Sequence, residues 1–185
     1  MKIVILTLMI FVIAMSANNA SELPKHLYVD SLNFEKRINT IHSKVIDLTD
    51  IFALHHIKEF NEVYFEPLKF EDSVIRYLQK PVSLENKIIA ICSMTKLPVN
   101  KYIDILNSYF LLYTKNKINE ELLNRSIFNE FDTDNRLTKQ YKNPQVRELL
   151  FKMINCNTLS KPFKADLKET LNGKRLNNLK RTGHL

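Results

Sequence analysis

The segment at residues 131–136 (FDTDNR) holds the side chains best suited to chemistry, because two carboxylates lie there within three residues. A calcium loop of the helix-loop-helix type needs oxygen ligands at alternate positions, a Gly at position six and a Glu at position twelve. Counted from Asp132, these two positions hold Leu137 and Asn143, which excludes such a loop. Asp132 and Asp134 are also too close in sequence to flank a reacting bond from opposite sides. The segment is therefore interpreted as a connector in which Asp132 caps a short helix.

His55 and Glu59 form the second candidate, because a helix would place residues four apart on one face. Two ligands do not make a metal site, no third ligand is evident, and the metalloprotease order H-E-x-x-H is absent. An ordinary helical surface is the favoured interpretation, and a metal role is the minor alternative. Serines are few and none has the context of a nucleophile, so we expect neither a cofactor nor enzymatic activity.

Glycine restricts the possible folds and sites further. The chain contains only Gly173 and Gly183. Phosphate-binding loops, dinucleotide fingerprints and nucleophile elbows all need Gly for positive φ or for close approach of the backbone. Tight Asn-Gly hairpins need it as well. The sequence therefore excludes these sites and favours an all-α fold.

Apolar residues recur at helical spacing after residue 30, with no internal repeat and no low-complexity linker. Ser83, Asn119 and Asn143 are suited to cap the starts of helices, and Gly173 is suited to end the last one. The pattern predicts a single compact domain of six to eight helices at residues 21–172. The helical segments are expected at about 32–60, 71–79, 84–92, 98–115, 119–127, 144–154 and 162–171.

The N-terminus has the composition of a secretory signal peptide, with a basic start, an apolar run at residues 3–15 and small residues after it. The apolar run is too short for a spanning helix, which needs about 20 residues. We expect residues 1–20 to direct the chain to the periplasm, with secretion as the alternative, and an uncleaved anchor as a further one. An oxidising compartment favours a disulfide between Cys92 and Cys156, and two buried free thiols are the alternative.

The excess of positive over negative charge lies mainly at the C-terminal end. Residues 21–160 carry 19 Lys and Arg against 18 Asp and Glu, whereas residues 161–185 carry 7 against 2. A neutral body with a basic, flexible tail at residues 173–185 is not the pattern of a nucleic-acid-binding protein, which places its cations on a folded face. A solvated terminus is the favoured interpretation, and weak contact with an anionic membrane surface or partner is the alternative.

Residues 96–150 resemble a family of small helical bacterial proteins. The family has an "LP…Y" helix, then an "E-L-L…I-F-P-G-Y-D-W-N" turn, and then an "L…Y…D-P-x-V-R" helix start. In this chain Asn129-Glu130 replaces the Pro-Gly of the turn and Thr133 replaces its Trp. The resemblance covers about a third of the mature chain. The residues that match in register are Leu97, Pro98, Tyr102, Leu122, Ile127, Phe128, Phe131, Asp132, Leu137, Tyr141, Pro144, Val146 and Arg147.

Such proteins are commonly encoded near interbacterial toxins, so the resemblance implies a periplasmic immunity protein that occludes a toxin delivered by type VI secretion. The alternative is a secreted helical-bundle ligand, or an envelope-binding factor that uses the basic tail. In the first case the exposed connector is the expected contact. Glu130, Asp132 and Asp134 would meet a cationic rim on the toxin, and Arg136 would meet an acidic catalytic group.

Overall fold

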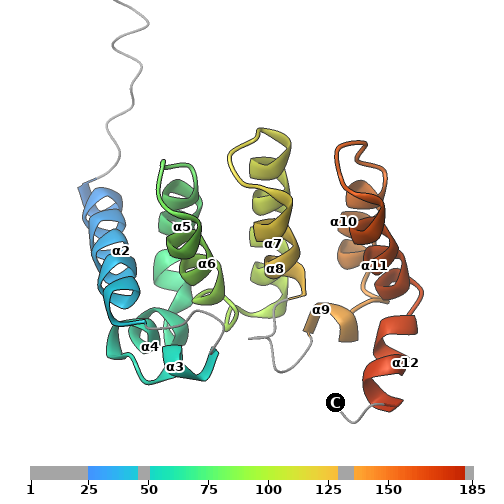
Figure 1. The fold of residues 1–185 in the computed structure, drawn as a ribbon, viewed down its shortest axis with the longest axis horizontal. Coiled ribbons are helices and arrows are strands. Elements are labelled where there is room, and N and C mark those ends of the chain that lie inside the picture. Colours follow the sequence, from blue (N-terminus) through green and yellow to red (C-terminus); the bar gives the residue numbers. More distant parts are fainter. Residues whose placement is uncertain (1–24, 46–50, 129–135, 182–185) are drawn as a thin grey trace, which may run out of the picture.

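The computed structural model describes residues 25–45, 51–128 and 136–181, and these residues form helices and turns without any strand. They contain eleven α-helices and one 3-10 helix, η1, more than the six to eight expected. Figure 1 shows their arrangement. The helices are α2 (Lys25–Lys44), α3 (Ile51–His55), α4 (Lys58–Phe65), η1 (Pro67–Phe70), α5 (Glu71–Leu78), α6 (Leu84–Cys92), α7 (Val99–Thr114), α8 (Glu120–Ile127), α9 (Arg136–Lys139), α10 (Pro144–Ile154), α11 (Lys161–Leu171) and α12 (Lys174–Arg181).

Part of the additional count comes from the segment at residues 32–60, where apolar spacing predicts one long helix. The structure has three helices there, α2, α3 and α4. The last break lies at Ile57, whose backbone is extended (φ −96°, ψ 119°) and whose side chain is buried. An apolar residue at helical spacing can thus fill the core from a break, because burial does not require helical backbone angles.

Three antiparallel helical hairpins form a row, α5/α6, then α7/α8, then α10/α11 (Figure 1). The first helices of the three hairpins pack together, because α7 contacts both α5 and α10. The second helices of the first two hairpins, α6 and α8, also contact each other. Helix α2 covers the open side of the first hairpin by packing against α5 and α6. Each hairpin thus buries its apolar face against a neighbour, as in tandem helical arrays.

The second helix of every hairpin begins in the same way. Ser83, Asn119 and Ser160 are the N-caps of α6, α8 and α11, and each side-chain oxygen accepts from the backbone N–H three residues later (3.2, 3.0 and 3.3 Å). The residue before each cap is apolar and at least half-buried: Val82, Ile118 and Leu159. The three hairpins therefore repeat in architecture and in helix capping, although the sequence shows no internal repeat. The expected caps at Ser83 and Asn119 are confirmed.

Hydrogen bonds join the hairpins near these caps. Lys87 Nζ donates to the carbonyl of Lys117 (3.2 Å), linking the first hairpin to the second. Glu120, the first residue of α8, accepts from the backbone N–H of Ser160 (2.7 Å) and from the Ser160 hydroxyl. Tyr113 Oη donates to the carbonyl of Thr158 (2.9 Å). The turns are thus held to one another as well as to their own helices.

The C-terminal segment, expected as a flexible tail, contains helix α12, which packs against α11 and α9. Gly173 ends α11 with positive φ (72°), as predicted for the residue that follows a helix. A Cβ at this position would lie 2.8 Å from the Tyr141 ring, so the close approach also requires Gly. The Arg175 guanidinium lies 4.2 Å from the centre of the Phe128 ring and fixes α12 on the body.

Candidate partner-binding surfaces

The acidic connector that the sequence selects as a contact site lies largely outside the described residues. This applies to Glu130, Asp132 and Asp134, and therefore also to the expected cap. Arg136 is the first residue of α9, and its side chain is not among those described. The role of these four residues in partner binding stays a prediction.

The expected disulfide is not formed, and Cys92 and Cys156 both keep their thiols. Cys92 ends α6 and is 1% exposed, whereas Cys156 follows α10 and is half-buried, with Sγ 3.1 Å from Thr158 Oγ1. In Figure 1 the α7/α8 hairpin stands between α6 and α10. A disulfide needs Cα atoms within about 7 Å, so the intervening hairpin explains why the two apolar stripes do not bring these thiols together.

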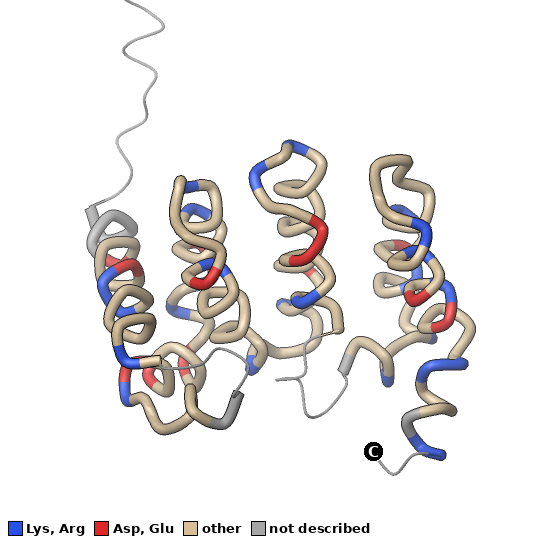
Figure 2. Tube along the Cα trace, in the orientation of Figure 1, with Lys and Arg blue, Asp and Glu red and all other residues tan. Residues whose placement is uncertain are grey.

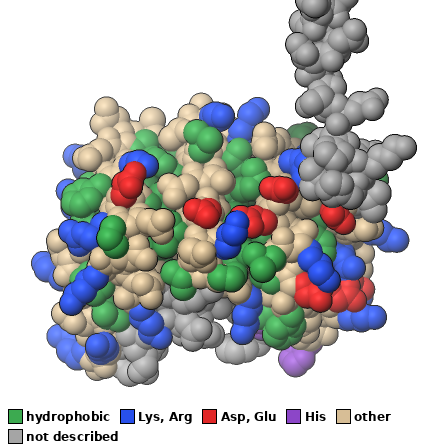
Figure 3. Space-filling view, turned by 180° about the vertical axis from the view of Figure 1, so that it is seen from behind, with side chains coloured by type: hydrophobic (Ala, Val, Ile, Leu, Met, Phe, Trp, Pro, Cys, Tyr) green, Lys and Arg blue, Asp and Glu red, His purple; other side chains and the backbone are tan. Residues whose placement is uncertain are grey.

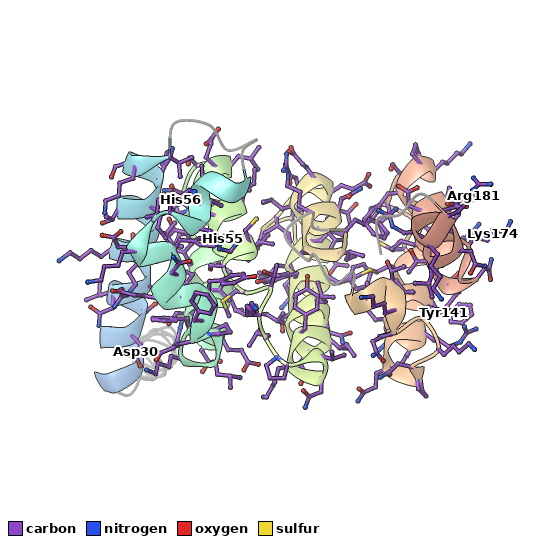
Figure 4. All side chains as sticks on the ribbon, turned by 90° about the horizontal axis from the view of Figure 1, so that it is seen from below. Asp30, His55, His56, Tyr141, Lys174 and Arg181 are labelled. Atoms are coloured by element: carbon purple, nitrogen blue, oxygen red, sulfur yellow. The ribbon has the colours of Figure 1, made fainter. Side chains whose placement is uncertain are left out.

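His55 and Glu59 do not share a helical face, because α3 ends at His55 and α4 begins at Lys58. The His55 ring packs edge-on against Phe60 and Tyr64, with centroids 5.3 and 4.8 Å apart. Glu59 instead accepts from Lys44 at 2.7 Å, and this hydrogen bond is the main cause that lowers the pKa of its carboxyl. Figure 4 shows where His55 and His56 lie at the turn between α3 and α4. Within the described ranges no three His, Cys, Asp or Glu side chains are grouped to hold a metal.

A groove of about 810 Å³ runs between α2, α4 and η1. Ion pairs form its walls, because Glu62 pairs with Arg37 and lies 3.7 Å from Lys58, and Glu66 pairs with Lys69. Positive and negative side chains therefore neighbour one another in the groove. Such paired charges suit the polar rim of a protein interface better than the binding of an ion of one sign. The residues that line it are Asp30, Asn33, Arg37, His56, Lys58, Asn61, Glu62, Phe65, Glu66, Lys69 and Phe70.

Two large exposed apolar side chains belong to the elements that form this groove, and one of them, Phe65, lines it. Phe65 ends α4 and is 65% exposed, and Leu68 in η1 is 56% exposed, whereas Phe60, Val63 and Phe70 around them are buried. The Lys96 ammonium lies 5.9 Å from the centre of the Phe65 ring and partly covers it. Sequence patterning does not reveal this pair, because the helical pattern ends at Pro67 and gives no sign of which apolar residues turn outward.

The opposite end of the row, formed by α9–α12, is strongly basic (Figure 2). Figure 3 shows the molecule from behind, so this end lies at the left of the view. Nearly every charged side chain at that edge is Lys or Arg. The Arg147 guanidinium donates to the carbonyl of Leu171 at the end of α11 (3.2 Å), where a cation stabilises the exposed carbonyls of a helix terminus. The molecule thus has two distinct candidate surfaces, the Phe65–Leu68 groove and the basic end.

Comparison of the chain with protein families, curated proteins and solved structures finds no match. The resemblance of residues 96–150 to periplasmic immunity proteins therefore stays a prediction. No helix of the described part of the chain has the length and apolar content needed to cross a membrane.

Proposed function

We propose that this protein is a binding protein that blocks a partner protein by covering it, and that it acts in the periplasm as an immunity protein against a toxin delivered to the cell envelope. The export-type N-terminus and the resemblance of residues 96–150 support the compartment and the class of partner. The row of hairpins supports a binding role, because such arrays present broad, rigid surfaces to partners.

The observation that carries the proposal is the exposed Phe65, which lines the groove, together with the exposed Leu68 of η1. Protein interfaces concentrate their binding energy in a few large side chains that are surrounded by a polar rim. Phe65 and Leu68 supply such an apolar centre, and the ion pairs of Glu62 and Glu66 supply the rim. Phe65 is the main anchor in this proposal, because aromatic rings bury more area than aliphatic side chains do.

The test measures the affinity of the protein for the product of the neighbouring gene, and protection of cells against it. The variant Phe65→Ala/Leu68→Ala removes the apolar centre and should weaken binding at least about 30-fold, since each anchor contributes more than about 1 kcal/mol. The matched control is Phe151→Ala/Leu111→Ala, which removes the same two side-chain types from positions 48% and 53% exposed. It should change the affinity less than about twofold.

Equal losses in both double variants would contradict a localised site at the groove. A loss confined to Glu130→Ala/Asp134→Ala/Arg136→Ala would instead place the contact at the acidic connector. A wild-type protein that neither binds the neighbouring product nor protects against it would refute the immunity function itself. Unfolding curves of every variant show whether the fold is retained.

A further inference from the structure

The basic end is set apart from the rest of the molecule by its charge. Residues 136–181 carry twelve Lys and Arg against three Asp and Glu. The other described residues from Asp30 onward carry thirteen against eleven. The net charge of this end is therefore +9, against +2 for the other described residues, so most of the net positive charge lies on α9–α12 and their connections (Figure 2).

The cations of this end are also largely unpaired. Among its acidic groups, Glu148 pairs with Lys152 at 2.7 Å. By contrast, seven ion pairs join described residues of α2–α8, for instance Lys44 with Glu59 and Lys80 with Glu35. Seven cationic side chains of the basic end form no ion pair, hydrogen bond or ring contact with any described residue. This unpaired basic set is Lys139, Lys161, Lys164, Lys168, Lys174, Lys180 and Arg181.

The unpaired basic set lies on folded helices and not on a free terminus. Helix α12 is held by the Gly173–Tyr141 contact and by Arg175 against Phe128. Figure 4 shows Lys174 and Arg181 at the outer edge of this end, pointing away from the body. Fixed cations on α11 and α12 can act together on one extended anionic surface, whereas those of a flexible tail would lose more conformational entropy on binding.

We propose that the basic end binds the surface of membranes that contain anionic phospholipids. Six of the seven unpaired cations are Lys, whose compact and strongly hydrated charge suits diffuse attraction more than the bidentate phosphate recognition typical of Arg. Each cation near an anionic leaflet strengthens binding roughly fivefold, so several together give a substantial affinity. The export-type N-terminus favours lipid over nucleic acid, because headgroups are the extended polyanion that an exported chain meets. This proposal does not depend on the toxin partner.

The test is co-sedimentation of the full chain with vesicles of phosphatidylcholine alone, or of phosphatidylcholine with about one third phosphatidylglycerol. The patch variant is Lys161→Glu/Lys164→Glu/Lys174→Glu, because carboxylates in the first turns of α11 and α12 suit the helix dipole and should spare the fold. The control variant Lys36→Glu/Lys115→Glu/Lys117→Glu makes the same change of net charge at exposed sites outside the basic end. Both keep residues 1–24, so any contribution of the apolar N-terminus cancels.

We expect phosphatidylglycerol to raise wild-type binding at least tenfold, and we expect the patch variant alone to lose that gain. The gain should fall as salt rises, because exposed charges are screened. The proposal is overturned if phosphatidylglycerol adds nothing, or if both variants lose binding equally. Tighter binding of the wild type to duplex DNA than to the anionic vesicles would also overturn it and would assign the surface to nucleic acid.

Discussion

Replacement of Glu120 by Ala should destabilise the protein more than any other change of a single carboxylate at the turns. Glu120 is half-buried and accepts two hydrogen bonds from Ser160, the N-cap of the next hairpin. A hydrogen bond to a charged group contributes about 1.5–3 kcal/mol, and a donor left unpaired costs about 1–3 kcal/mol. Because the site is partly exposed, we expect a loss of about 2 kcal/mol, which lowers the Tm by about 4–8 °C for a chain of this size.

Glu121→Ala is the matched control, because Glu121 also lies in the first turn of α8 and its ion pair with Arg125 is half exposed. An exposed ion pair of this kind contributes about 0.5 kcal/mol or less. Urea unfolding followed by circular dichroism measures both changes. Equal losses in the two variants, or a loss below about 0.5 kcal/mol for Glu120→Ala, would refute the idea that this carboxylate joins the hairpins. A double-mutant cycle with Ser160→Ala should show coupling, because the two side chains share a hydrogen bond.

Three further predictions concern α12, a buried phenol and the thiols. Gly173→Ala should cost about 2 kcal/mol in urea unfolding, because positive φ strains Ala and its Cβ would press on Tyr141. Burial, assisted by a nearby carboxylate, raises the pKa of Tyr77 to about 12, so its contribution to stability holds below pH 10 and is lost as pH rises toward 12; phenolate absorbance of folded and unfolded protein checks this. Thiol titration should find two free thiols per denatured chain, and in the folded protein Cys156 should react long before buried Cys92.

Local signals in the sequence predict the ends of helices well. Ser83, Asn119 and Asn143 cap helices as expected, and Gly173 follows the end of α11. These predictions succeed because a cap depends on a side chain and a backbone N–H only two or three residues apart. The all-α class is also confirmed, since it follows from apolar spacing and the near absence of Gly.

The sequence does not predict which distant segments of the chain contact one another. Cys92 and Cys156 both end apolar stripes, yet the order of the hairpins places α7/α8 between them. Ile57 has the spacing of a helical residue but fills the core from an extended break. The tail is basic enough to suggest a solvated end, yet Arg175 packs on an aromatic ring 47 positions earlier in the chain. Each outcome depends on partners distant in sequence, which periodicity does not encode.

The two proposed surfaces lie at opposite ends of the row of hairpins (Figure 1). The groove with Phe65 is formed by α2, α4 and η1, whereas the unpaired cations lie on α9–α12. Because each hairpin packs only on its neighbours in such an array, contact at one end need not disturb the other. A protein held to a membrane by its basic end would therefore present the Phe65–Leu68 groove away from the bilayer. An inhibitor placed in this way would meet an incoming toxin at the membrane surface. This arrangement connects the basic end to the proposed immunity function without requiring both surfaces to bind the same partner.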